Sequence, residues 1–211
     1  MKRFVTYAAP AAPLLICLPL TASPAAQVPQ VPLAFEPNVG QADGQEKFQS
    51  RAPHFMIWLT ARGAMLGLPG MKTSSYAEIQ CPGGNPAPWL GAEEKRPGFI
   101  NYFMGRDRRN WHTDVPQYGR VRYRDVYRGI DLVFYGGPPN LEYDFDLAPG
   151  ADPLRTSIAF VGARNVSLDA DGSLVLDIGD AQLRNLPPRI TQEGKRVEGH
   201  WTLRGKYRAG S

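Results

Sequence analysis

The sequence contains little cysteine and little histidine, and this scarcity excludes several kinds of site. Only two cysteines and three histidines occur among 211 residues. His54, His112 and His200 have no second His or Cys at a spacing typical of zinc ligands, so we expect no metal site. Phosphate-binding loops, dinucleotide-binding turns and serine-nucleophile elbows are also missing. The sequence therefore assigns no residue to catalysis, to a cofactor or to a metal.

Neither sign of charge is in large excess. The formal net charge is +4, and it falls to +2, from 22 basic and 20 acidic residues, when Lys2 and Arg3 are removed with the N-terminal segment. Proteins that bind nucleic acid usually carry a stronger basic excess. We therefore expect no nucleic-acid partner.

Helical periodicity is missing as well. No window of 11 or more residues keeps apolar positions at helical spacing without a Gly or Pro. Short aromatic and β-branched segments alternate with turn residues, which predicts an all-β fold: a mostly antiparallel, sandwich-like domain with many short strands and hairpins and little helix. The expected strands are 47–51, 54–60, 63–68, 75–80, 99–103, 118–127, 130–135, 140–147, 155–161, 164–169, 173–178, 181–185, 189–193 and 196–204.

Two of the expected turns are well marked. Asp171-Gly172 is typical of a tight hairpin, and this turn explains the nearby aspartates better than a calcium loop does, because Gly172 comes too early for that motif. Residues 136–140, Gly-Gly-Pro-Pro-Asn, predict a broader hairpin.

The N-terminus has the layout of a signal peptide. Lys2 and Arg3 precede an uncharged, mostly apolar run from Phe4 to Leu20, and small residues follow it. Three prolines interrupt the run, which is too short for a spanning helix. We expect residues 1–26 to be cleaved, and the mature protein to be exported to the cell surface or the extracellular space, or to the periplasm, without a transmembrane segment.

Cleavage would leave one cysteine. Ile16 stands where a lipoprotein signal needs a small residue, so Cys17 is read as an apolar filler rather than a lipidation site. Cys81 then has no internal disulfide partner and is either buried or a lone thiol.

Residues 27–211 suit a single β-rich domain. Within it, residues 81–98 are dense in Pro and Gly and end in a mixed charge run, which predicts a long exposed loop. Trp89 in this loop either stacks on a sugar ring or packs back to hold the loop.

Two rows of like charges alternate with apolar residues in neighbouring segments: Arg120, Arg122 and Arg124 in the first, and Glu142, Asp144 and Asp146 in the second. If 118–127, 130–135 and 140–147 form a meander, the rows lie on the outer strands of one exposed sheet face, with Asp131 between them. Three interpretations follow: a solvated face held by cross-strand pairs, a carbohydrate-active enzyme that uses the carboxylates, or an anionic-glycan-binding module that uses the arginines.

Four pieces of the chain, in order, resemble the N-terminal domain of bacterial surface proteins that carry seven-bladed β-propeller repeats (SBBP repeats). The pieces are FEPNVGQ at 35–41, NYF at 101–103, residues 118–135 and residues 141–153. The resemblance runs from Pro32 to about Trp201, and it implies an exported β-rich domain of unknown function. The repeats are absent here, so we expect a domain truncated at its C-terminal end.

The sequence as a whole predicts an exported, non-catalytic structural or recognition module of a cell-surface or secreted protein. The alternative is a carbohydrate-active enzyme or anionic-glycan-binding module that uses the charge rows. The partner class left open is a cell-surface glycan or protein.

Overall fold

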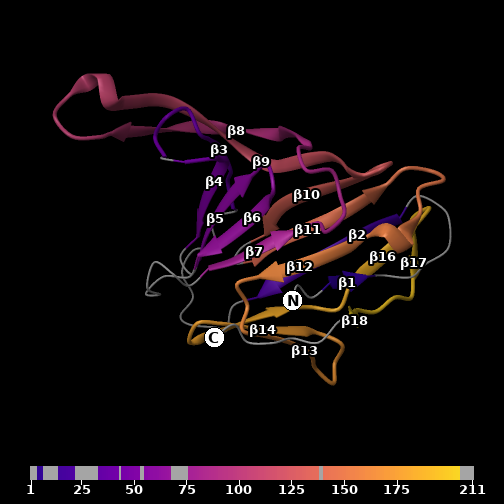
Figure 1. Cartoon of the computed structure of the whole chain (residues 1–211). Coiled ribbons are helices and arrows are strands. Elements are labelled where there is room, and N and C mark those ends of the chain that lie inside the picture. The colour runs from indigo at the N-terminus through magenta and orange to yellow at the C-terminus, as the bar shows by residue number, and fades with distance from the viewer. Residues whose placement is uncertain are drawn as a thin grey trace.

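A computed structural model gives the structure of the chain and describes residues 4–6, 14–21, 33–42, 44–52, 55–67, 76–137 and 140–204. β Strands dominate it (Figure 1). The helical elements of these residues are two three-residue 3-10 turns, η1 (Arg108–Asn110) and η2 (Pro153–Arg155). All pairings between named strands are antiparallel, so the predicted all-β, antiparallel fold is confirmed.

The first sheet contains eight strands. Its order places the C-terminal strand at one edge and the short β3 at the other. From edge to edge the strands are β18 (Thr202–Arg204), β1 (Phe4–Thr6), β12 (Ser157–Val161), β7 (Tyr76–Gln80), β6 (Gly63–Gly67), β5 (Phe55–Thr60), β4 (Glu46–Ala52) and β3 (Glu36–Pro37).

The second sheet contains ten strands. Its main path is β13 (Asn165–Leu168), β14 (Leu174–Ile178), β15 (Ala181–Asn185), β2 (Leu14–Thr21), β11 (Asn140–Leu147), β10 (Ile130–Gly137), β9 (Trp111–Tyr127) and β8 (Trp89–Phe103). Beside this path, β16 (Arg189–Gln192) pairs with β2 and with β17 (Lys195–Val197).

The two sheets enclose one hydrophobic core. Buried residues of the first sheet, such as Ile57 and Ile79, belong to the same cluster as Phe134 and Phe145 of the second. The Tyr123 hydroxyl of β9 reaches across this core and lies 2.9 Å from the carbonyl oxygen of Thr60, the last residue of β5. The alternation of buried and exposed residues along the strands is therefore what a sandwich-like packing requires.

Most of the expected strands are present within one or two residues of their predicted limits. Residues 196–204 are an exception, because they form two strands, β17 and β18, with residues outside any strand between them. The Asp171-Gly172 turn joins β13 to β14, and Gly172 supplies the positive φ of 83°. Beside the turn, Asp169 and Asp171 accept hydrogen bonds from Arg184, which agrees with a hairpin rather than a calcium loop.

The expected loop over 81–98 is only half correct. Residues 81–88 form a loop, whereas residues 89–98 belong to β8, whose backbone pairs with β9 from Trp89 opposite Arg124 to Phe103 opposite Trp111. The Pro and Gly content misled the prediction because Gly98, with φ of 103°, sits at an irregularity in the pairing rather than in a loop.

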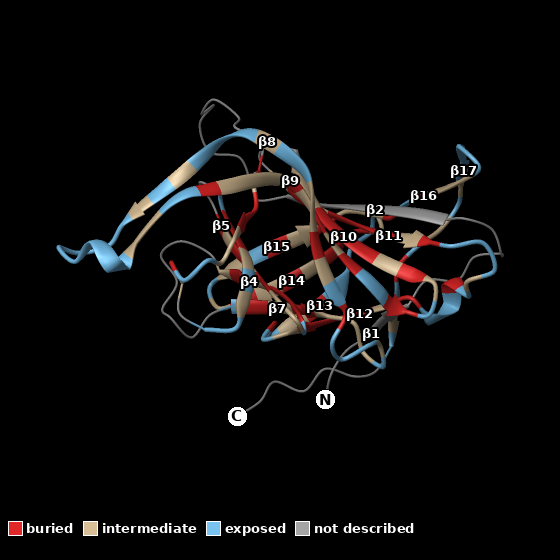
Figure 2. Cartoon of the chain, turned by 90° about the horizontal axis from the view of Figure 1, so that it is seen from above, coloured by how far each residue is buried: buried red, intermediate tan, exposed pale blue. Residues whose placement is uncertain are grey.

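The β8–β9 hairpin extends well beyond the body of the protein (Figure 1). From above, most of β8 in the outer half is exposed, whereas β9 is mostly half-buried there and includes the buried Val115 (Figure 2). We call this outer part, residues 94–118, the arm. The sequence predicted one part of each strand of the hairpin, 99–103 in β8 and 118–127 in β9. It did not predict that the two strands pair continuously beyond these parts.

Two strands come from the segment expected to be a signal peptide. β1 lies between β12 and β18, and β2 lies between β11 and the pair β15 and β16. In the described part of the chain, no helix is long and apolar enough to cross a membrane.

A buried hydrogen bond joins two strands of the second sheet that are far apart in sequence. The Asn185 side-chain amide donates to the Tyr143 hydroxyl over 2.8 Å, and both residues are fully buried. Removing the hydroxyl would leave a buried amide hydrogen without its partner.

We expect Tyr143→Phe to lower the free energy of unfolding by about 1 to 3 kcal/mol, as measured by urea denaturation at neutral pH. Tyr76→Phe is the matched control, because Tyr76 is 42% exposed and its hydroxyl can be solvated. Equal stability of the two variants would contradict the assigned role of this hydrogen bond.

Candidate functional site

The charged rows identified in the sequence lie on one face of the second sheet. In the register of β9, β10 and β11, Arg122 is opposite Val133, which is opposite Asp144, and Arg120 is aligned in the same way with Tyr135 and Glu142. The predicted meander and the shared face of the two rows are therefore confirmed.

Arg122 is the centre of this face. Its Nε lies 2.6 Å from a Glu93 oxygen, and its Nη1 lies 3.2 Å from Asp131 and 2.5 Å from Asp146. The hydrogen bond with Glu93, and then that with Asp146, holds the pKa of the Arg122 guanidinium above its usual range. Asp131 thus stands between the rows as expected, while the β8 residue Glu93 is a partner that local pattern did not indicate.

The other two arginines of the row stack on aromatic rings. The Arg124 guanidinium lies 4.7 Å from the centre of the Trp89 ring, and that of Arg120 lies 4.7 Å from the Tyr135 ring. Arg120 also approaches Glu94 at 3.5 Å. Each guanidinium of the row is therefore engaged within the protein.

Trp89 occupies a strand rather than a loop. Its ring lies along β8 over Gly91, where an added Cβ would come within 2.0 Å of the indole. The ring is 60% exposed, with Arg124 against it. It is held in place by its neighbours and still reaches solvent, and stacking on a sugar ring stays a prediction.

The expectation that this face is exposed is wrong at its centre. Val133 is completely buried, although it lies on the charged face and outside the main core cluster, and Asp144 is 2% exposed. Arg122, which is opposite Val133, binds three carboxylates, and its side chain is 19% exposed. Arg124, at the margin of the face, is exposed.

The arrangement of carboxylates does not favour glycoside hydrolysis. Asp146 is bound to Arg122, and Asp144 is buried beside it in the same row. A pair of catalytic carboxylates must instead face each other across an accessible scissile bond. Among the described residues, no group of three side chains is placed to hold a metal ion.

The arm presents a different kind of surface. Phe99 and Phe103 are 58% and 62% exposed, and Met104 is also exposed. At the tip, the Phe103 ring meets Trp111 edge-on, with 5.0 Å between centroids. Large apolar side chains gathered on a projecting hairpin are uncommon unless they contact something else.

Polar contacts shape the tip around these rings. The Arg108 guanidinium lies 5.2 Å from the centre of the Trp111 ring, and the Trp111 indole nitrogen donates to the Gly105 carbonyl over 3.2 Å. Asp107 caps the 3-10 turn η1 and binds Arg109 at 2.7 Å. The tip is thus a defined structure with both aromatic and cationic groups.

The FEPNVGQ motif holds the base of the arm. Phe35 is fully buried and exchanges two backbone hydrogen bonds with Tyr118, of 2.8 and 2.9 Å. Asn38 binds the backbone of Ala42 and Glu46, which closes the loop that follows β3. Gly40 lies against the His112 ring, where an added Cβ would come within 2.8 Å. The motif therefore has a structural role as a clamp on β9.

A second contact ties the arm to the first sheet. The Tyr102 hydroxyl donates to the buried Glu36 carboxylate and accepts from the Gln49 amide at 3.0 Å, and the Arg51 guanidinium lies over the Tyr102 ring. Burial, and then the Glu36 carboxylate, raises the pKa of Tyr102 to about 12. The tyrosine of the NYF piece is thus bound to the glutamate of the FEPNVGQ piece.

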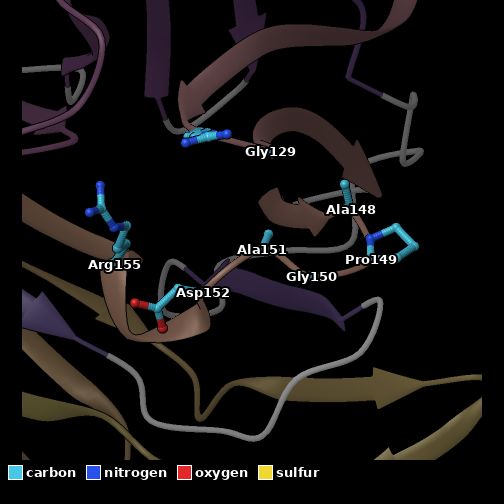
Figure 3. Close-up of a pocket in the computed structure, with 8 residues that line it drawn as sticks. Gly129, Ala148, Pro149, Gly150, Ala151, Asp152 and Arg155 are labelled. Carbon is cyan, nitrogen blue, oxygen red and sulfur yellow. The ribbon is translucent and has the colours of Figure 1, made fainter.

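A cavity of about 580 Å³ opens at the other end of β9, between the turn at Arg128-Gly129 and residues 148–155 (Figure 3). Arg128, Asp152 and Arg155 supply its charged groups, and all three are exposed. Asp152 caps the turn η2 by accepting from the Leu154 amide. The capping role of Asp152 in this turn is therefore a structural one.

Cys81 is packed against the core. Burial raises the pKa of its thiol to about 12, so it stays protonated at neutral pH. Cys81 is thus a free thiol that is partly buried, so it lies between the two alternatives that the sequence left open.

Comparison with known proteins assigns the chain to a family. The family model described as a domain of unknown function (DUF7948) matches residues 35–209. The chain belongs to this family. No curated protein and no solved structure matches it.

The DUF7948 match begins at Phe35, at the clamp, and includes the charged face and the whole arm. It contains β3 to β18 and leaves out β1 and β2. Sequence reasoning found the charged rows but missed the arm. A signal for the arm is present in the sequence. Phe99, Asn101 and Phe103 alternate as in a strand, and residues 104–110 could form the turn that leads to a second strand at 111–116.

We expect Arg122→Met to lower the free energy of unfolding by about 1 to 3 kcal/mol at pH 7, because three carboxylates would share the site without a cation. The deficit should shrink as the pH is lowered toward 3, since protonation relieves the repulsion. Urea denaturation at several pH values measures it.

Arg109→Met is the matched control, because it removes an ion pair whose arginine side chain is 90% exposed. Its unfolding curve should overlay that of the unaltered protein. A pH-independent deficit in Arg122→Met would mean that lost packing, not charge, is responsible.

We expect Glu36→Gln to lower the pKa of Tyr102 from about 12 to a value that stays above 10, because the negative charge is lost while burial remains. Absorbance at 295 nm against pH, minus the curve of Tyr102→Phe, isolates this group. Since the folded pKa lies above the unfolded value of 10.0, the stability linked to Tyr102 is complete below pH 10 and is lost between pH 10 and 12. An unchanged Tyr102 titration would exclude Glu36 as a cause.

Proposed function

We propose that this DUF7948 protein is an exported, non-catalytic recognition module of a cell-surface or secreted protein, and that the arm is its contact element. The observation that supports this most is the pair of exposed rings, Phe99 and Phe103, on a projecting hairpin whose base is clamped. The partner is a cell-surface glycan or protein.

The arm has the properties of a binding element. Aromatic and arginine side chains supply most of the binding energy in many interfaces, and the tip carries Phe103 and Trp111 with Arg108 against the indole. The clamp at Phe35 and the Glu36–Tyr102 contact hold the base. A hairpin ordered in advance loses less conformational entropy on binding.

The charged face supports a structural role. Its guanidinium groups are engaged by Glu93, Asp131 and Asp146 and by aromatic rings, so an anionic glycan would have to displace contacts already made. The same contacts are unfavourable for catalysis by the acid row. We therefore assign recognition to the arm rather than to the sheet face.

The N-terminal segment supports export. The basic residues, the apolar run and the small residues before position 27 have the order of a cleaved signal. The four pieces that resemble the head domain of SBBP-repeat proteins support a place at the cell surface. Two of them, FEPNVGQ and NYF, meet in the Glu36–Tyr102 contact.

The test is binding to cell envelopes of the bacterium that encodes the chain. We expect the Phe99→Ser/Phe103→Ser variant to bind at least about tenfold more weakly than the unaltered protein, as measured by co-sedimentation, while its unfolding midpoint is unchanged. Loss of binding after periodate treatment of the envelopes identifies a glycan, and loss after protease treatment identifies a protein.

The control is Leu154→Ser/Leu168→Ser, which removes two exposed apolar side chains away from the arm. This variant should bind as the unaltered protein does. Equal binding by the arm variant and the control would reject the arm as the contact element, and a chain that stays in the cytoplasm would reject export.

A further inference from the structure

One strand of the second sheet is supplied from outside the DUF7948 match. β2 lies between β11 on one side and β15 and β16 on the other, all of which lie inside the match. It pairs with β11 over six positions, from Leu15 opposite Asp146 to Leu20 opposite Leu141. It pairs with β16 over four more.

The place that β2 fills is deep in the fold. On the β11 side, Leu141, Tyr143 and Phe145 are at most 1% exposed. On the other side, Asn185 and Ile190 are completely buried. Without a strand between them, β11 and β16 would both present unpaired backbone N–H and C=O groups beside a hydrophobic core.

The same residues are the apolar run of the expected signal peptide. A signal that is cleaved during export cannot also remain as a central strand of the exported molecule. The proposed function therefore implies that β2 leaves this place and that the mature protein has a vacant slot, which we define as the gap between β11 and β15 with β16.

The slot admits only one strand. Neighbouring strands lie about 4.8 Å apart, so the flanking strands are separated by roughly 10 Å. An edge strand of a second folded copy would bring its own sheet and would not fit between them. The occupant must be a single extended segment with both of its edges free.

The flanking residues define the occupant's chemistry. Positions 16, 18 and 20 of β2 are opposite Phe145, Tyr143 and Leu141, which face the core, and this chain has Ile, Leu and Leu there. Cross-strand partners share a face, so an occupant needs large apolar residues at three alternate positions. The intervening positions are opposite the acid row and tolerate polar residues.

Residues 27–32 and 205–211 do not meet this requirement. Residues 27–32, QVPQVP, have valines three positions apart, which cannot face the same side of a strand. Residues 205–211, GKYRAGS, have one large apolar side chain, that of Tyr207.

We propose that the slot is a strand-acceptor site, and that in the exported protein it binds an extended segment of a second polypeptide. The segment lies antiparallel to β11 and β16 and carries apolar residues at three alternate positions. This inference rests on the proposed export with cleavage of residues 1–26. The domain would then have two binding elements, the strand-acceptor site and the arm.

The test uses the protein exported from a bacterial host that expresses the full chain, with its N-terminus determined by mass spectrometry. The probe is a synthetic peptide of residues 14–21 with Cys17→Ser and two lysines at each end. We expect saturable binding, and hydrogen exchange of the β11 and β16 amides slowed at least about tenfold, while the amides of β5 and β6 are unchanged.

The control peptide carries Ile16→Asp and Leu18→Asp, which place carboxylates opposite Phe145 and Tyr143. It should bind at least about tenfold more weakly, because buried carboxylates would have no partner. A mature protein that unfolds cooperatively only when the first peptide is present would also support the inference.

Three results would overturn the inference and leave export intact: an exported protein that still begins at Met1, slow exchange of β11 and β16 in the mature protein without peptide, or no effect of the peptide. A dimer with protected β11 amides belongs to the second case, because the occupant would then be a second copy of this chain rather than a different polypeptide. Retention in the cytoplasm would instead reject the proposed function and the inference together.

Discussion

The antiparallel pairing along β9 is the interaction on which the rest of the structure depends. Its inner half lies between β10 and β8 and carries Arg122 on one face and Tyr123 on the other, so it holds the charged cluster and crosses the core to the Thr60 carbonyl. Its outer half pairs with β8 to form the arm. An isolated two-stranded hairpin is marginally stable in water. The arm therefore needs the clamp at Phe35, where the first sheet meets β9.

Local alternation in the sequence was enough to predict the part of the fold where neighbours in sequence are neighbours in space. The meander of β9, β10 and β11 and the shared face of the two charge rows follow from a period of two and short turns. The partner Glu93 could not be found in this way, because its strand was hidden by Pro and Gly that make bulges instead of a loop. The burial of Asp144 could not be predicted either, because a period of two shows which face a residue lies on but not what covers that face.

The structure shows what two motifs do that were identified only by resemblance, FEPNVGQ and NYF. FEPNVGQ contributes a buried Phe, a buried carboxylate, an Asn that closes a loop, and a Gly that admits the His112 ring. Tyr102 of NYF brings its hydroxyl to that carboxylate from more than sixty positions away in sequence. This contact gives both pieces a structural role in the same domain.

The arm and the slot are opposite solutions to the same requirement, that the backbone of each strand find partners. In the arm, β8 and β9 satisfy each other outside the core, so the surface is left free to display aromatic side chains. In the slot, β11 and β16 cannot satisfy each other, because one strand separates them and their inner faces are buried. Water could solvate the open edges, but it could not cover Tyr143, Phe145 and Ile190 without losing the hydrophobic contribution of that part of the core. A sheet of this kind loses stability when the central place is vacant, so the strand that fills it, which is β2 in this structure, contributes to the stability of the whole domain.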